Sequence, residues 1–208
     1  MTFQSIEQLL ALVQDKPALE IGLSVATSND YAEWARNINR AVDHALRQMA
    51  QNPELRQAKG EDELTIELVS LLNMMDIEAG HDTKVGGHVD IRIKGKRDYH
   101  WLAEAKKHKQ DYAWLMQGFQ QLNTRYTTGL AGQDKGGFIV YSDHARIDRT
   151  MSKWRDHLEE QKIEGMSFSN CELNDLSFQS THPHDRTGRP LEVRHIALSI
   201  YFDPKDRI

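Results

Sequence analysis

The sequence predicts a mixed α/β (α+β) fold, in which helices flank a β-sheet. Two observations lead to this prediction. An amphipathic helical pattern at about 61–75 is followed directly by a clean strand alternation in HVDIRIKG. Beyond it, helical and strand patterns continue to the end of the chain, with a helix at about 111–127, a buried strand at 137–141, a helix at 145–162 and strands at about 173–180 and 191–202.

Composition fits one globular domain with, at most, a small appendage. The chain has 208 residues, of which 39% are hydrophobic and 27% charged. The net charge of −5 argues against a surface coated in positive charge, although it permits a local basic groove. We find no signal peptide and no apolar run long enough to cross a bilayer. The lone cysteine, Cys171, fits a reducing compartment, and we expect a cytoplasmic protein without a disulfide.

Residues 1–58 predict an N-terminal helical extension to the main domain at 59–208. A short apolar helix is expected near 6–13, ended or interrupted by Pro17. Ser28, Asn29 and Asp30 are candidate N-caps for a longer helix that ends near Pro53. Its core-facing stripe comprises Trp34, Ile38, Ala41, Ala45 and Met49. The extension carries no recognisable chemistry and is either a helical cap or a dimerisation element.

A predicted β-hairpin brings three functional side chains to one face of the sheet. The turn GKRD joins HVDIRIKG to YHWLAEAK. Alternate residues of a strand share a face, so Glu104 and Lys106 project together and Ala105 points away. If the two strands pair, Asp90 reaches the same face. The hairpin then presents two carboxylates and one ammonium at a single place.

Phosphodiester hydrolysis uses such a set of groups. Mg²⁺ takes carboxylate, water and phosphate oxygens, and it lowers the pKa of its water while offsetting charge on the leaving oxygen. Lys106 can orient the attacking water, stabilise the pentacovalent phosphate or act as a base with a lowered pKa. The sequence leaves these roles open. A solvated hairpin face is the structural alternative, but the apolar run around Glu104 argues against it.

Asp90 followed by Glu104-Ala105-Lys106 on consecutive strands resembles the PD-(D/E)XK nuclease superfamily over residues 60–142. Val89 stands where that family often has proline. The resemblance implies a restriction-endonuclease-like core, and a Mg²⁺ or Mn²⁺ ion held by Asp90, Glu104 and the backbone carbonyl of Ala105. It also implies an acidic residue on the preceding helix, for which Glu63 is the first choice and Glu67 the alternative.

Basic residues near this motif predict contacts with nucleic acid. The segment 92–109 holds seven lysines and arginines against two acidic residues. We assign Lys107 and Lys109 to phosphate contacts, whereas Lys94 and Lys96 are equally well explained as a solvated hairpin edge. On the next helix Gln121 is expected to face the site, and Arg125 to touch phosphate; the alternative is a solvated helix face.

These features predict a metal-dependent nuclease, most simply a DNA endonuclease. Restriction or phage defence follows from the resemblance alone. Cutting a duplex needs two sites, so we expect a homodimer or a subunit of a larger complex. The alternatives are a nucleic-acid- or partner-binding module without turnover, and an enzyme that uses the tail histidines His182, His184 and His195. Beside Pro and Gly in a hairpin turn, we expect these histidines to be solvent-exposed.

Overall fold

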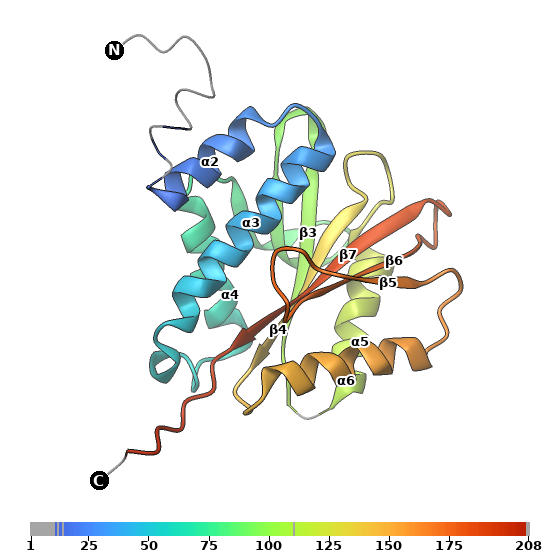
Figure 1. The fold of residues 1–208 in the computed structure, drawn as a ribbon. Helices are drawn as coiled ribbons and strands as arrows, with labels where there is room; N and C mark the ends of the chain where they lie inside the picture. Colours follow the sequence, from blue (N-terminus) through green and yellow to red (C-terminus); the bar gives the residue numbers. More distant parts are fainter. Residues whose placement is uncertain (1–10, 12, 14, 110, 207–208) are drawn as a thin grey trace, which may run out of the picture.

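The computed structural model describes residues 11, 13, 15–109 and 111–206. It confirms the mixed α/β fold: one seven-stranded sheet with parallel and antiparallel pairs lies between helices α2, α3 and α4 on one side and α5 and α6 on the other (Figure 1). The predicted helix near 6–13 falls largely on residues 1–10, outside the described ones. None of the helices in the described part is long and apolar enough to span a bilayer.

The elements follow the predicted order with two additional strands. The helices are α2 (Pro17–Thr27), α3 (Tyr31–Ala50), α4 (Glu61–Asn73), α5 (Tyr112–Gln121) and α6 (Ile147–Glu160). The strands are β1 (Ala79–Lys84), β2 (His88–Lys94), β3 (His100–Lys107), β4 (Lys135–Ser142), β5 (Ser167–Asn170), β6 (Phe178–Pro183) and β7 (Pro190–Ser199). Short turns of 3₁₀ type, η1 (Pro53–Leu55) and η2 (Lys96–Asp98), and of π type, η3 (Leu122–Tyr126), complete the list.

The strands lie in the order β1-β2-β3-β4-β7-β6-β5. The central strands β3, β4 and β7 are parallel, and an antiparallel pair joins the sheet on each side. The predicted β2–β3 hairpin is confirmed, with Ile91 opposite Ala103. The two tail strands also pair as a hairpin, with Phe178 opposite His195, but the first of them, β6, begins at Phe178 and not near 173. The sequence missed β1 and β5, because AGHDTK and SFSN are polar and lack the alternation of a half-buried strand.

Each face of the sheet has its own hydrophobic core. Helices α2, α3 and α4 cover a core that includes Ile91, Trp101 and Ile139, whereas α5 and α6 cover one that includes Phe138 and Val193. Strand alternation sends successive residues to opposite cores. The site described below lies on the α5 side.

The N-terminal helices pack directly on the sheet. Asp30 caps α3 by accepting a hydrogen bond from the Glu33 amide at 2.9 Å, and the predicted stripe of α3 is buried. Pro17 begins α2, since its missing N–H costs nothing at the first helical position. Arg194 of β7 forms a buried ion pair with Asp43 of α3 at 2.7 Å, which ties the predicted extension to the domain.

Candidate active site

Asp90 lies where β2 and β3 stop pairing. The last paired residues toward this end are Ile91 and Ala103, so the next pair in register would be Asp90 and Glu104. Instead of a backbone ladder, the Asp90 carboxylate accepts a hydrogen bond from the backbone N–H of Ala105 at 2.9 Å. The side chain thus satisfies a buried strand amide and is held in one position beside β3.

Lys106 connects three carboxylates that come from three different elements. Its Nζ lies 2.7 Å from Oε1 of Glu104 on β3, 3.1 Å from Oε1 of Glu61 on α4 and 3.7 Å from Oδ2 of Asp90 on β2. The predicted grouping of Asp90, Glu104 and Lys106 is therefore present in the structure. Burial acts to lower the pKa of Lys106, but the negative charges of Glu104, Asp90 and Glu61 together outweigh it and raise that pKa, so the side chain is an ammonium at neutral pH.

Glu104 is the most buried acid of the group. Its exposed fraction is 2%, and its Oε2 is buried without a hydrogen-bond partner among the described residues. Burial, reinforced by the nearby Asp90 charge, raises the pKa of Glu104 to about 7 although Lys106 acts in the opposite direction. A buried carboxylate with an oxygen that lacks a hydrogen-bond partner lowers the stability of the fold. Such a group within a cluster of acids is a candidate functional position.

Helix α5 closes over the lysine through a glycine. A Cβ at Gly118 would lie 2.8 Å from Cγ and Cε of Lys106 and 3.1 Å from the Phe138 ring, so only glycine allows this close approach. Trp114, one turn earlier, places its ring 5.6 Å from Nζ of Lys106. Its 40% exposure leaves part of this indole at the surface above the site.

The helix carboxylate beside Lys106 is Glu61, whereas Glu63 and Glu67 are held elsewhere. Glu63 accepts a hydrogen bond from the Gly60 amide at 2.8 Å and caps its own helix. Glu67 pairs with Arg56 and Lys59. Glu61 also accepts a 2.6 Å hydrogen bond from the Lys107 amide.

The sequence held a signal that identifies Glu61. The buried stripe Leu64, Leu68 and Leu72 faces the sheet. Extended one turn toward the N-terminus, that stripe reaches Glu61, while Glu63 falls on the exposed side. Position along the helix face, and not closeness to the helix start, decides which acid enters the site.

The predicted phosphate-contacting lysines occupy different environments. Nζ of Lys107 is held inside the fold, where it donates to the carbonyls of Gln57 and Lys59 and pairs with Asp143 at 3.1 Å. It therefore fixes the segment before α4, which carries Glu61. Lys109 is exposed and lies just beyond the end of β3.

The predicted polar stripe on α5 also lies at the surface. Gln121 and Arg125 line a shallow hollow of ≈ 270 Å³ together with Gln117, Gln120 and Thr124. Arg125 is exposed, and its carbonyl lies against Gly86 of the β1–β2 turn. The following residue, Tyr126, lies close enough for the Asp90 and Glu104 charges to add to the burial that raises its pKa.

The tail histidines are buried, so the expectation of exposed turn residues is wrong. Exposed fractions are 4% for His182, 1% for His184 and 0% for His195. His195 lies between the Trp154 indole N–H, which donates to its Nδ1, and the Ser180 hydroxyl at its Nε2. These contacts describe a packed core histidine. The expectation failed because His182 and His195 lie on strands whose alternate residues face the α6 core, and because His184, just after β6, packs against Thr127 and Gly129.

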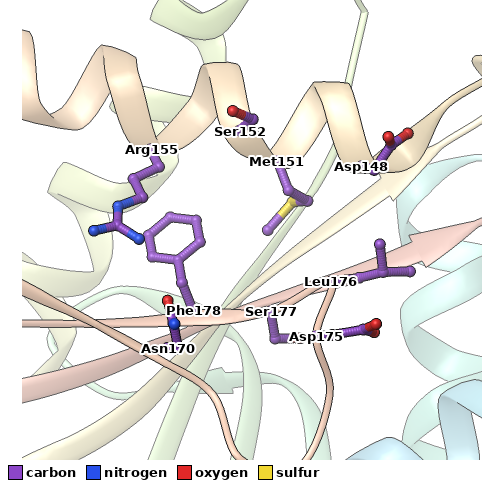
Figure 2. A pocket seen from close by; sticks show the side chains of 9 residues that line it. All are labelled: Asp148, Met151, Ser152, Arg155, Asn170, Asp175, Leu176, Ser177 and Phe178. Carbon is purple, nitrogen blue, oxygen red and sulfur yellow. The ribbon is translucent and has the colours of Figure 1, made fainter.

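A second hollow, of ≈ 220 Å³, lies between α6 and β6 and is separate from these acids. Figure 2 shows Arg155 at one end of it and the carboxylates of Asp148 and Asp175 at the other, with the Phe178 ring between. None of its lining residues comes from β2, β3 or α4. The acid and lysine cluster and this hollow are therefore separate features of the structure.

The donor set of the cluster suits a hard cation. Its candidate ligand atoms are all carboxylate oxygens, which hard cations prefer, and Oε2 of Glu104 has no hydrogen-bond partner within the described part of the chain. Among the described residues, no group of three His, Cys, Asp or Glu side chains is arranged to hold a metal ion. In the cluster, the Lys106 ammonium lies between the acids. Comparison of the chain with family models, curated proteins and solved structures finds no significant match.

Proposed function

We propose that this protein is a metal-dependent nuclease of the restriction-endonuclease-like type, acting most simply as a DNA endonuclease. The observation that carries the proposal is that Asp90, Glu104 and Lys106 of the β2–β3 hairpin converge with Glu61 of α4. The resemblance of the motif to PD-(D/E)XK nucleases supports the same function. The single cysteine of the chain, Cys171, is consistent with a reducing, cytoplasmic setting.

Asp90, Glu104 and the backbone carbonyl of Ala105 would hold Mg²⁺ or Mn²⁺, with Glu61 as a further carboxylate. Bound there, the ion supplies Lewis-acid polarisation of the phosphate and a water of lowered pKa. The Ala105 amide fixes Asp90, and the Lys107 amide fixes Glu61, so both acids are oriented before substrate arrives.

Lys106 acts as a cation and not as a base in this proposal. Its ammonium lies among acids and beneath Gly118, which restricts it to one place on the sheet. From there it donates a hydrogen bond to the attacking water or to a non-bridging phosphate oxygen. Charge that develops on the pentacovalent phosphate is then stabilised by a fixed donor. Cutting both strands of a duplex requires two such sites, and hence a homodimer or a partner subunit.

Plasmid cleavage tests the proposal. We expect nicking or linearisation with Mg²⁺ or Mn²⁺, none with EDTA, and loss of cleavage in Lys106→Ala and Glu104→Ala. Lys153→Ala, an exposed change on α6, is the matched control and should cleave normally. Absence of cleavage on plasmid, single-stranded DNA and RNA would contradict the proposal.

One observation favours the alternative of a binding module without turnover. In the described residues the Lys106 ammonium occupies the space among the carboxylates, and no three-ligand metal group is preformed. A binding module predicts that nucleic acid binds equally well with Mg²⁺ and with EDTA and is never cut. The nuclease predicts metal-dependent cleavage, so the same plasmid experiment with a binding assay separates the two.

A further inference from the structure

Strand β2 continues past Asp90 with two basic residues on the same face of the sheet. Val89, Ile91 and Ile93 are buried, while Asp90 and Arg92 are half-buried and Lys94 is exposed. Alternate residues share a face, so Arg92 and Lys94 lie on the side of Asp90. Two strand residues span about 7 Å, which separates the backbone positions of Arg92 and Asp90.

A shallow hollow of ≈ 180 Å³ opens beside these two cations. Its lining is formed by Glu78, Ala79, Gly80, Thr83, Arg92 and Lys94. Gly80 of β1 lies directly opposite Arg92 in the strand register and adds no side chain above it. Glu78 is an exposed acid immediately before β1, so the lining has two cations and one carboxylate.

Arg92 lacks the anionic partner that a half-buried guanidinium normally has. Its Nε is buried without a hydrogen-bond partner, and its NH2 lies 3.3 Å from Nε2 of His100. None of the described Asp or Glu side chains forms an ion pair with it, although Arg40, Arg56 and Arg194 all have one. A guanidinium carries five N–H donors in a fork that matches phosphate oxygens. Among the described residues this half-buried guanidinium therefore has no acidic partner, which points to an anionic ligand.

We propose that the hollow at Arg92 and Lys94 binds a backbone phosphate of the nucleic-acid strand whose neighbouring phosphate lies at Asp90, Glu104 and Lys106. This inference rests on the proposed nuclease function and adds the path of the substrate. In this proposal the nucleic-acid strand runs along β2, over the face of the sheet formed by β1 and β2. Contacts to phosphate position a strand without reading its bases, so this contact is independent of sequence.

Binding of a fluorescent single-stranded oligonucleotide, followed by anisotropy in EDTA from about 50 to 200 mM salt, tests the inference. Variants Arg92→Gln and Lys94→Gln are compared with Arg149→Gln and Lys153→Gln, which remove equal charge from exposed positions on α6. Loss of one phosphate contact should weaken affinity at each salt concentration and reduce the slope of log K against log salt by about 0.7, the value per contact for a single strand.

The result expected is a smaller salt slope for Arg92→Gln and Lys94→Gln and an unchanged slope for both α6 variants. Lys94 is exposed, so its variant reports binding even if Arg92→Gln is less stable. If the wild type binds and all four variants have the same salt slope, the phosphate position is overturned but the proposed nuclease function is not. Failure of the wild type to bind DNA or RNA, with or without Mg²⁺, would overturn both.

Discussion

Replacement of Lys106 by Met tests the electrostatics of the site directly. Methionine keeps most of the apolar stem under Gly118 and removes only the ammonium. The change leaves Glu61, Asp90 and Glu104 without their common counter-ion. We expect a large loss of stability in metal-free protein at pH 8, where Glu104 is ionised in the wild type.

The magnitude follows from burial. The Lys106 and Glu104 side chains are 9% and 2% exposed, so their 2.7 Å pair is a buried one, whose disruption costs about 3–5 kcal/mol. Glu61 and Asp90 retain 26% and 24% exposure, and solvent reduces each of their contributions to about 1 kcal/mol or less. Glu104 therefore dominates, and the double variant Lys106→Met with Glu104→Gln should recover much of the loss.

Urea denaturation at pH 8 and pH 5 in EDTA is the assay. Lys106 lowers the pKa of Glu104, so in Lys106→Met this pKa lies higher still and the acid is neutral at pH 5. The stability difference from wild type should therefore shrink at pH 5. A loss below about 1 kcal/mol at pH 8, or one equally large at both pH values, would refute the reasoning.

Three further predictions follow from the same contacts. The folded-state pKa of Glu104 is raised to about 7, so ionisation of this acid lowers the free energy of unfolding of the metal-free protein as the pH rises from about 4.5 to 7. Glu104→Gln should flatten this pH dependence in urea titrations. A pH profile parallel to that of the wild type would contradict the prediction. Gly118→Ala should lower stability by about 1–3 kcal/mol and abolish cleavage, although alanine normally stabilises a helix, and an unchanged or higher Tm would contradict the packing over Lys106. Asp43→Asn should cost about 3–5 kcal/mol because Arg194 stays buried, and a loss no larger than that of the exposed control Asp62→Asn would contradict the importance of the pair.

The sequence predicted the fold wherever hydrophobic periodicity was strong. The α3 stripe is buried, the buried residues of β2 alternate, and the apolar run in β4 is buried on both faces of the sheet, so local pattern and tertiary packing agree. Strands β1 and β5 are edge strands with polar sequences, and only pairing with a neighbour makes them strands.

The sequence predicted the site residues that lie within one hairpin, but not those that other elements bring to the site. Asp90, Glu104 and Lys106 belong to one hairpin, whose period of two fixes their common face. Glu61 depends on how α4 is rotated about its axis against the sheet. The internal role of Lys107 depends on the segment before α4, and no local pattern reports such a contact.

Comparison of Glu61→Gln with Glu63→Gln in the Mg²⁺-dependent plasmid cleavage assay tests the central claim most directly. Both changes remove one carboxylate from the first turn of α4, so charge and helix position are closely matched. The account predicts that Glu61→Gln slows cleavage by about 10–100-fold, whereas Glu63→Gln cleaves at the wild-type rate. Equal rates for the two variants, or a slower Glu63→Gln, would contradict a site built from Glu61, Asp90, Glu104 and Lys106.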